Sequence, residues 1–102
     1  MIIMNITKDY NGKELTLSVE GRIDTITSQE LDNGIHNELN NFDSLIIDCT
    51  DLEYISSAGL RVLIATQKIL KAENIPLIIK NVSAPVNEIF RMSGFNKILQ
   101  IE

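Results

Sequence analysis

Two neighbouring hydroxyl groups, those of Ser56 and Ser57, stand where an apolar run ends and an amphipathic run begins. A serine at a strand-to-helix junction is where α/β-hydrolases carry their nucleophile, so nucleophilic hydrolysis is the first chemistry to test. The partners for it are missing. Ile55 stands two residues before Ser57, where that motif has glycine, and the single histidine, His36, falls on a polar position of another expected helix. No catalytic residue is therefore predicted, and a small serine hydrolase stays the remote alternative.

Metal and nucleotide chemistry find equally little support. The chain has one Cys and one His, so metal ligands would have to come from scattered carboxylates. Neither of the common glycine-rich phosphate-binding loops is present in the sequence. The sequence therefore predicts no metal and no cofactor for this chain.

Ser57 has a simple structural explanation as a helix N-cap, whose side-chain oxygen accepts a backbone N–H. Three features of its neighbours favour a further role. Ser56 supplies a second hydroxyl where one cap would suffice, and Ala58 and Gly59 are small enough to leave the hydroxyl and the following N–H groups open. Leu60 replaces the glutamate that would complete a capping box. A helix start with free N–H groups and no acidic residue in its first turn accepts a phosphate.

A phosphate on this serine should leave the fold intact. A phosphoserine carries about −1.5 to −2 charges at pH 7, and the helix dipole favours it at an exposed N-terminus by about 0.3–1 kcal/mol. A switch at this position would instead act on a partner, which must desolvate the added charge when it binds.

Two strands and a tight turn are predicted before this junction, at the start of the chain. Residues 2–8 alternate apolar and polar side chains, and residues 14–20 alternate more regularly. Asn11-Gly12 lies between them and favours an antiparallel hairpin with one face toward water. Residues 21–25 are interpreted as a loop that leaves the second strand.

Helices and buried strands alternate over the rest of the chain. Thr27 and Glu30 have capping-box spacing, and the apolar stripe that follows predicts a helix over residues 28–40. Ser83 and Gly94 mark the start and the stop of another helix. The remaining predicted elements are a strand buried on both faces at 45–47, a helix from the Ser57 junction to about Asn74, a buried strand at 77–79 and a last strand at 98–101.

The order β-β-α-β-α-β-α-β predicts an α/β fold with a mixed β-sheet of about five strands, an antiparallel first hairpin and three crossover or packing helices. The expected extent is one domain over residues 1–102, because 44% of the 102 residues are hydrophobic and a chain of this length builds one core.

Charge and composition restrict the partners and the compartment. A net charge of −5 with few aromatic side chains disfavours nucleic acid as a partner. The lone Cys49 lies in an apolar run, which predicts a buried thiol in a reducing compartment. No segment is long and apolar enough for a membrane span, and no signal peptide is recognised, so a cytoplasmic protein without a membrane partner is expected.

Three sequence blocks, in their order and spacing, resemble the STAS-domain anti-sigma factor antagonists, also called anti-anti-sigma factors. The blocks are Gly21-Arg22-Ile23-Asp24 leading to Thr27, then Asp51-Leu52-Glu53-Tyr54-Ile55-Ser56-Ser57-Ala58-Gly59-Leu60, and finally Phe90-Arg91-Met92-Ser93-Gly94-Phe95. The resemblance covers essentially the whole chain and implies a single STAS domain. Within the third block, Phe90 and Met92 are expected in the core.

The resemblance implies a partner controlled by phosphorylation. In this family, an anti-sigma factor that is also a serine kinase of the histidine-kinase-like ATPase fold phosphorylates one serine of the antagonist. The unphosphorylated antagonist binds the anti-sigma factor and frees the sigma factor for transcription, and a metal-dependent phosphatase resets the phosphorylated form. ATP and magnesium belong to the kinase. By alignment to the family motif, the phosphorylation site maps to Ser57.

The chain departs from the family pattern at the residue before the acceptor. Many members carry Asp there, whereas this chain has Ser56, which makes Ser56 the alternative acceptor and leaves open which carboxylate orients the hydroxyl. Asp24 is the candidate for that role, and a turn residue before a helix is an equally good explanation for it. Arg61 would meet an acidic partner patch, a phosphate or solvent. The predicted partner-binding residues are Asp24, Ser56, Ser57, Ala58, Gly59 and Arg61.

One further alternative keeps the fold and changes the role. The chain could be a STAS subunit that docks in a transporter or another signalling assembly without phosphorylation.

Overall fold

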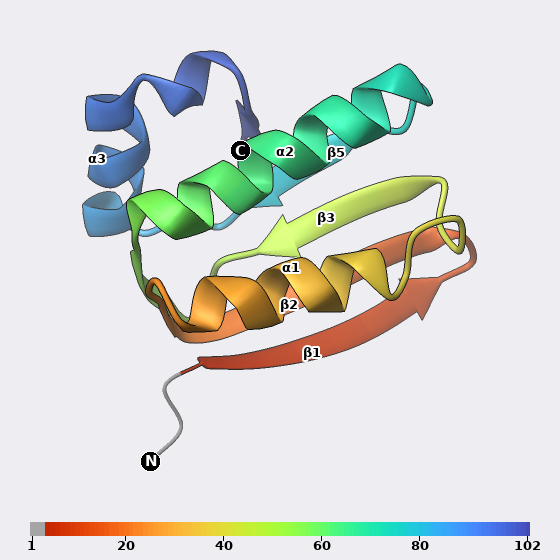
Figure 1. The fold of residues 1–102 in the computed structure, drawn as a ribbon, viewed down its shortest axis with the longest axis horizontal. Coiled ribbons are helices and arrows are strands. Elements are labelled where there is room, and N and C mark those ends of the chain that lie inside the picture. The colour runs from red at the N-terminus through yellow and green to blue at the C-terminus, as the bar shows by residue number, and fades with distance from the viewer. Residues whose placement is uncertain (1–3) are drawn as a thin grey trace.

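The computed structural model describes residues 4–102, which form one mixed six-stranded sheet and three α-helices (Figure 1). The predicted α/β class is confirmed. The elements are β1 (Met4–Asn11), β2 (Glu14–Ile23), α1 (Thr27–His36), β3 (Ser44–Asp48), β4 (Leu52–Ile55), α2 (Ser57–Ala72), β5 (Leu77–Lys80), α3 (Ala84–Ser93), a 3₁₀ turn (Phe95–Lys97) and β6 (Gln100–Ile101).

The first two strands form the expected antiparallel hairpin. Asn11 pairs with Glu14 across a two-residue connection, and Gly12 in that connection has a φ of 62°, which a glycine adopts without strain. The predicted first strand is described from Met4 and runs on to Asn11. Ile2, the first apolar residue of that prediction, lies outside the described residues.

The second strand is longer than predicted and organises the sheet. Residues 21–23 were expected in a loop, but they continue β2 because they pair with β4 in parallel register. The earlier half of β2, from Glu14 to Ser18, pairs in parallel with β3. Since β1 occupies the other edge of β2, β3 and β4 follow one another along the same edge. The expected five strands therefore become six, and the additional strand is β4.

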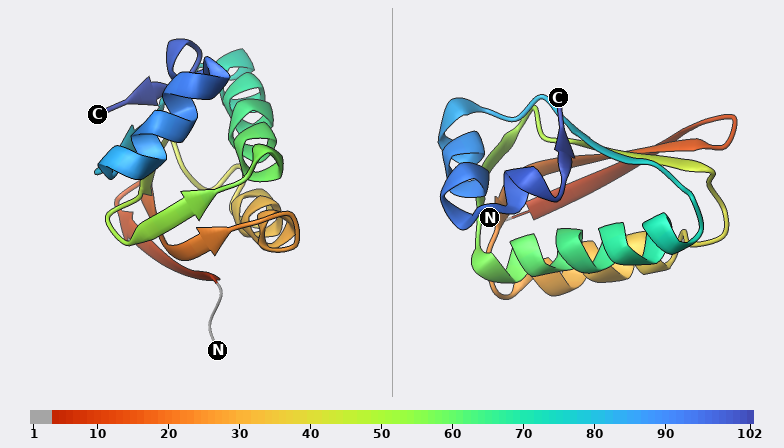
Figure 2. Two further views of the ribbon diagram at one scale, coloured as in Figure 1. Left: turned by 90° about the vertical axis from the view of Figure 1, so that its left-hand side faces the viewer. Right: turned by 90° about the horizontal axis from the view of Figure 1, so that it is seen from above.

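The helices α1 and α2 cover one face of the sheet (Figure 2). Leu45 and Ile47 of β3 are fully buried, whereas Ile46 between them is only half-buried. Burial of β3 on both faces was therefore a wrong prediction, and the same alternation occurs in β5. The reason is that α1 and α2 both pack on the same face. Each fully buried Leu or Ile on that face stabilises the fold by roughly 1.5–3 kcal/mol.

The helix boundaries agree with the sequence at α2 and α3 better than at α1. Ser83 caps α3 through a bond from the Val86 amide at 3.4 Å, and Gly94 ends it with a φ of 79°, both as predicted. The first helix ends at His36 and not near residue 40, and a non-helical turn follows it.

Two expectations about the C-terminal block need correction. Phe90 is buried at 0% exposure, as predicted, but Met92 is 78% exposed. The two residues lie on opposite sides of α3, because a spacing of two places side chains about 200° apart on a helix. The predicted strand at 98–101 is reduced to β6, since a 3₁₀ turn occupies the residues just before it.

Candidate functional site

The candidate site lies where β2 and β4 end and the helices that follow them begin. Ile23 pairs with Ile55 in parallel register, and the Ser56 amide donates to the Ile23 carbonyl at 2.7 Å. The turn that begins at Asp24 therefore lies beside the start of α2. The end-on view in Figure 2 shows the starts of α1 and α2 at this end of the molecule, with α3 lying across it.

Ser56 is the N-cap of α2. Its backbone is extended, with φ −83° and ψ 170°, and its Oγ accepts the Gly59 amide at 3.2 Å. The residue is buried, at 9% exposure. The capping role considered for Ser57 therefore belongs to the preceding serine, which explains why two serines stand together.

Ser57 is the first residue of α2 and is exposed. Within residues 4–102, its hydroxyl makes no hydrogen bond, and the first turn of α2 contains no acidic residue. The hydroxyl therefore faces solvent at the positive end of a sixteen-residue helix. Ala58, the next residue, is half-buried.

Gly59 has a packing role and not the open position expected from its small size. A Cβ added there would lie 2.6 Å from Cγ2 of Ile23 and 2.8 Å from Cγ1 of Ile55. Both isoleucines are 1% exposed, so they are held in the core. Glycine lets the first turn of α2 approach β2 and β4 closely, and its amide is occupied by Ser56. The explanation that Gly59 leaves N–H groups open was wrong.

Asp24 holds the turn before α1. Its Oδ1 accepts the amides of Ile26 at 2.9 Å and Thr27 at 2.8 Å. The bond from the Thr27 amide, followed by the Thr27 hydroxyl and the Ile26 amide, lowers the pKa of the Asp24 carboxyl, and partial desolvation opposes the shift. No hydrogen bond joins Asp24 to the Ser57 hydroxyl in the described part of the chain. Of its two explanations, the structure shows the turn residue before a helix.

Thr27 was expected to be the cap of α1, and it has a different function. Its hydroxyl donates to the Arg22 carbonyl at 2.8 Å and accepts the Asp24 amide at 2.8 Å, and the residue is buried. The side chain therefore ties the end of β2 to the start of the helix. The capping bonds come from Asp24, three residues earlier.

The arginines near this end differ in their contacts. Arg22 lies over the ring of Tyr54, with its guanidinium carbon 4.5 Å from the ring centre. Arg91 is bound to Glu88 by two hydrogen bonds within α3, one of them 3.0 Å from Nε to Oε2. Arg61 is exposed on α2, and among the described residues it makes no ion pair.

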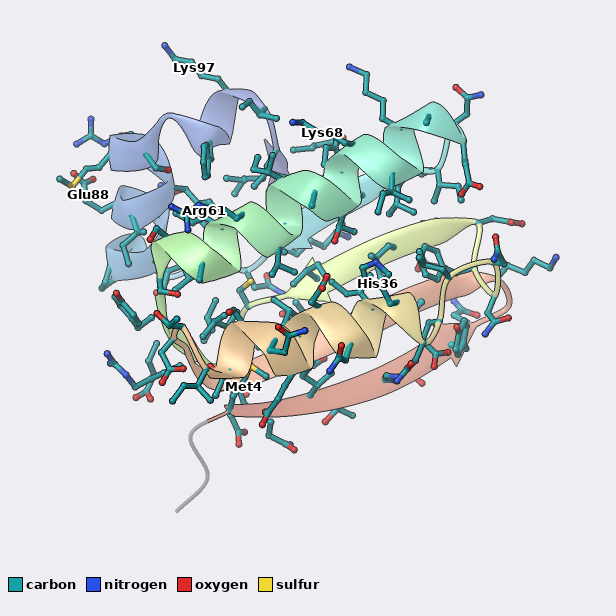
Figure 3. All side chains as sticks on the ribbon, viewed as in Figure 1. Met4, His36, Arg61, Lys68, Glu88 and Lys97 are labelled. Atoms are coloured by element: carbon teal, nitrogen blue, oxygen red, sulfur yellow. The ribbon has the colours of Figure 1, made fainter. Side chains whose placement is uncertain are left out.

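The lone histidine lies far along α1 from this site. His36 is in the last turn of α1, where Nδ1 lies 2.9 Å from the Asp32 carbonyl, whereas Ser57 is at the start of the neighbouring helix. Figure 3 shows His36 on α1 and Arg61 near the start of α2. Across residues 4–102, no cluster of three metal-ligating side chains is present. The described geometry does not bring a base to the Ser57 hydroxyl.

A groove of about 500 Å³ lies near the site but does not include Ser57. It is lined by Glu20, Gly21, Thr50, Asp51, Leu52 and Glu53. Three of these side chains are carboxylates, which disfavour an anionic ligand in the groove.

The family assignment follows from a match between the sequence and a family model. The STAS domain model matches residues 4–102, which is the whole described chain. The chain belongs to the STAS domain family. No helix in the described part of the chain is long and apolar enough to cross a membrane.

Several proteins similar to this STAS domain are named as anti-sigma factor antagonists. BtrV of Bordetella bronchiseptica, which carries such a name, is 27% identical over 99 residues that cover 96% of this chain and 85% of BtrV. An anti-sigma factor antagonist from Mycobacterium paratuberculosis has a TM-score of 0.87 at 22% identity, covering 96% of this chain and 84% of that one.

The antagonist SpoIIAA has been solved in two states that share this fold. The unphosphorylated form has a TM-score of 0.82 at 16% identity and covers 96% of this chain and 88% of that one. The phosphorylated form, from Bacillus, has a TM-score of 0.75 at 15% identity, with 96% and 91% covered. At these identities the likeness concerns the fold.

Proposed function

We propose that this STAS domain is an anti-sigma factor antagonist that acts as a phosphorylation-controlled switch. In its unphosphorylated form it binds an anti-sigma factor and thereby frees a sigma factor. That anti-sigma factor is a serine kinase of the histidine-kinase-like ATPase fold, and Ser57 is the residue it phosphorylates. A metal-dependent serine phosphatase removes the phosphate, and the cycle runs in the cytoplasm.

One observation carries the proposal: the two adjacent serines have different environments. Ser56 is buried and its Oγ is occupied by the Gly59 amide, whereas the Ser57 hydroxyl is exposed and uncommitted among the described residues. A kinase has to reach the hydroxyl of its substrate and remove its proton, which requires access from solvent. Ser57 therefore supports the proposal as the acceptor, and Ser56 is better explained as a cap.

The position of Ser57 also explains how a phosphate would act. At the first residue of α2 the added charge meets the positive end of the helix dipole, so folding is not opposed. A partner that covers the hydroxyl would have to desolvate a dianion after phosphorylation. Each 1.4 kcal/mol of that cost lowers the affinity about tenfold.

The partner surface proposed around the acceptor consists of exposed or half-exposed residues. Asp24, Ser57, Ala58 and Arg61 meet this requirement. Ser56 and Gly59 are buried, so they contribute by fixing the position of Ser57 and not by direct contact.

Phosphorylation of the wild-type protein and of two variants tests the assignment. A pull-down with the wild-type protein first isolates the histidine-kinase-like serine kinase encoded in the same genome. The wild-type protein, Ser57→Ala and Ser56→Ala are then incubated with this kinase, ATP and magnesium. Peptide mass spectrometry should find one phosphate at Ser57 in the wild type and in Ser56→Ala, and none in Ser57→Ala. Labelling of Ser57→Ala at the wild-type level would overturn the assignment. A pull-down that retains a transporter ATPase instead would favour a docking subunit.

A further inference from the structure

The proposed phosphoserine would have a cation within reach on its own helix. Ser57 and Arg61 are four residues apart in α2, and such positions are neighbours on a helix surface, about 5–6 Å apart at Cβ. Both side chains are exposed, and Figure 3 shows Arg61 near the start of the helix. Helical side chains lean toward the N-terminus, which brings the guanidinium toward Ser57.

Arg61 is available for this contact, unlike the other arginines. The chain contains three arginines. Arg22 stacks on the Tyr54 ring, and Arg91 is held by Glu88. Over residues 4–102, Arg61 has neither a hydrogen bond nor an ion pair, and no acidic residue in the first turn of α2 competes for it.

We propose that Arg61 is the intramolecular partner of a phosphate on Ser57. The inference rests on the proposed function, because it needs a phosphate at that serine. A guanidinium presents two parallel N–H groups that match two phosphate oxygens, and an anion placed N-terminal to a cation at this spacing is the favourable order.

The pair gives the phosphate a second effect on the surface. Before phosphorylation, the Arg61 guanidinium is free to meet an acidic group of a partner. After phosphorylation, the same guanidinium is bound by the phosphate. A dianion is therefore added to the surface, and a cation next to it is no longer available to a partner. Both changes oppose the contact that the unphosphorylated surface makes.

A phosphorus NMR titration tests the pair without any kinase. Phosphoserine is introduced at position 57 during translation, in the otherwise unchanged chain and in Arg61→Gln, Arg61→Lys and Lys68→Gln. Lys68 is the matched control, because it is an exposed cation on the same helix. It lies about 16 Å along the helix axis from position 57, which is beyond the screening length at physiological salt. The measured quantity is the second pKa of the phosphate, which an adjacent cation lowers.

The expected result is a phosphate pKa about 0.3 unit lower with Arg61 than with Arg61→Gln, since an exposed pair of this spacing contributes about 0.3–0.5 kcal/mol and one pKa unit is 1.36 kcal/mol. Arg61→Lys should retain part of the shift, and Lys68→Gln should retain all of it. Equal pKa values in the unchanged protein and Arg61→Gln would overturn the inference. The proposed function fails separately, through absence of kinase labelling at Ser57, which this titration does not require.

Discussion

Gly59→Ala should destabilise the protein, although alanine is the better helix former. The added Cβ would lie 2.6 Å from Cγ2 of Ile23 and 2.8 Å from Cγ1 of Ile55, and neither atom is the free end of a flexible side chain. Overpacking of this kind costs about 1–3 kcal/mol, and the higher helix propensity of alanine returns up to about 1 kcal/mol. The expected net loss is about 1–2 kcal/mol, with Tm lowered by about 4–8 °C for each kcal/mol.

Urea unfolding followed by circular dichroism measures this loss, and Gly34→Ala is the matched control. Gly34 is also inside a helix, but a Cβ there meets only the terminal Cδ1 of Ile6, at 3.4 Å. Its helix propensity should dominate and raise the free energy of unfolding by up to about 1 kcal/mol. If Gly59→Ala proved as stable as the wild type, the close approach of α2 to β2 and β4 would not be what requires glycine.

Three further perturbations follow from the same geometry. Ser56→Ala should lower the free energy of unfolding by about 1 kcal/mol through loss of the cap, whereas Ser57→Ala should stay within about 0.5 kcal/mol; the reverse ranking in urea unfolding would move the cap to Ser57. Hydrogen bonds lower the folded-state pKa of Asp24 below its ordinary 3.8. The ionised carboxylate therefore stabilises the fold above pH 3.8, and this stabilisation is lost as the pH falls through the lower folded-state pKa. The free energy of unfolding of Asp24→Asn should accordingly depend less steeply on pH below about pH 4. An unchanged acid limb would refute this. Burial raises the pKa of the Cys49 thiol to about 12, so a disulfide reagent should modify it only in urea, and rapid labelling of the native protein at pH 8 would contradict its burial.

Local sequence patterns predicted the elements that local chemistry determines. The alternation in residues 14–20, the two-residue connection after Asn11 and the boundaries of α3 at Ser83 and Gly94 all appear in the structure. In each case the signal is contained within a few residues, as a strand period, a turn glycine or a cap.

The errors arise where a distant segment decides the outcome. Residues 21–23 have no clear strand pattern of their own, and they are extended because β4 pairs with them. The spacing of Thr27 and Glu30 predicted Thr27 as the cap of α1. Asp24 makes the capping bonds instead, because the end of β2 places the Asp24 carboxylate over the first amides of the helix. If the parallel pairing of Ile23 with Ile55 had been known, it would have predicted both β4 and the position of this turn.

For the two adjacent serines, the sequence predicted the position of the site but not which serine caps the helix. From the sequence, Ser57 was the candidate for both the cap and the acceptor, with Ser56 as the alternative acceptor, and the structure gives the cap to Ser56. Only the burial of Ser56 and the short distance from its Oγ to the Gly59 amide separate them. Arg61 carried no local signal beyond its spacing, because whether it has a partner among residues 4–102 depends on the segments that surround it in the fold.

Affinity for the kinase in the two phosphorylation states tests the central proposal most directly. Titration calorimetry compares the unmodified protein with the protein that carries phosphoserine at position 57, each added to the serine kinase that the unmodified protein retains in a pull-down. The phosphorylated form should bind at least tenfold more weakly, because desolvating the added dianion costs at least 1.4 kcal/mol. Equal affinity of the two forms would contradict the account, even if the kinase modifies Ser57.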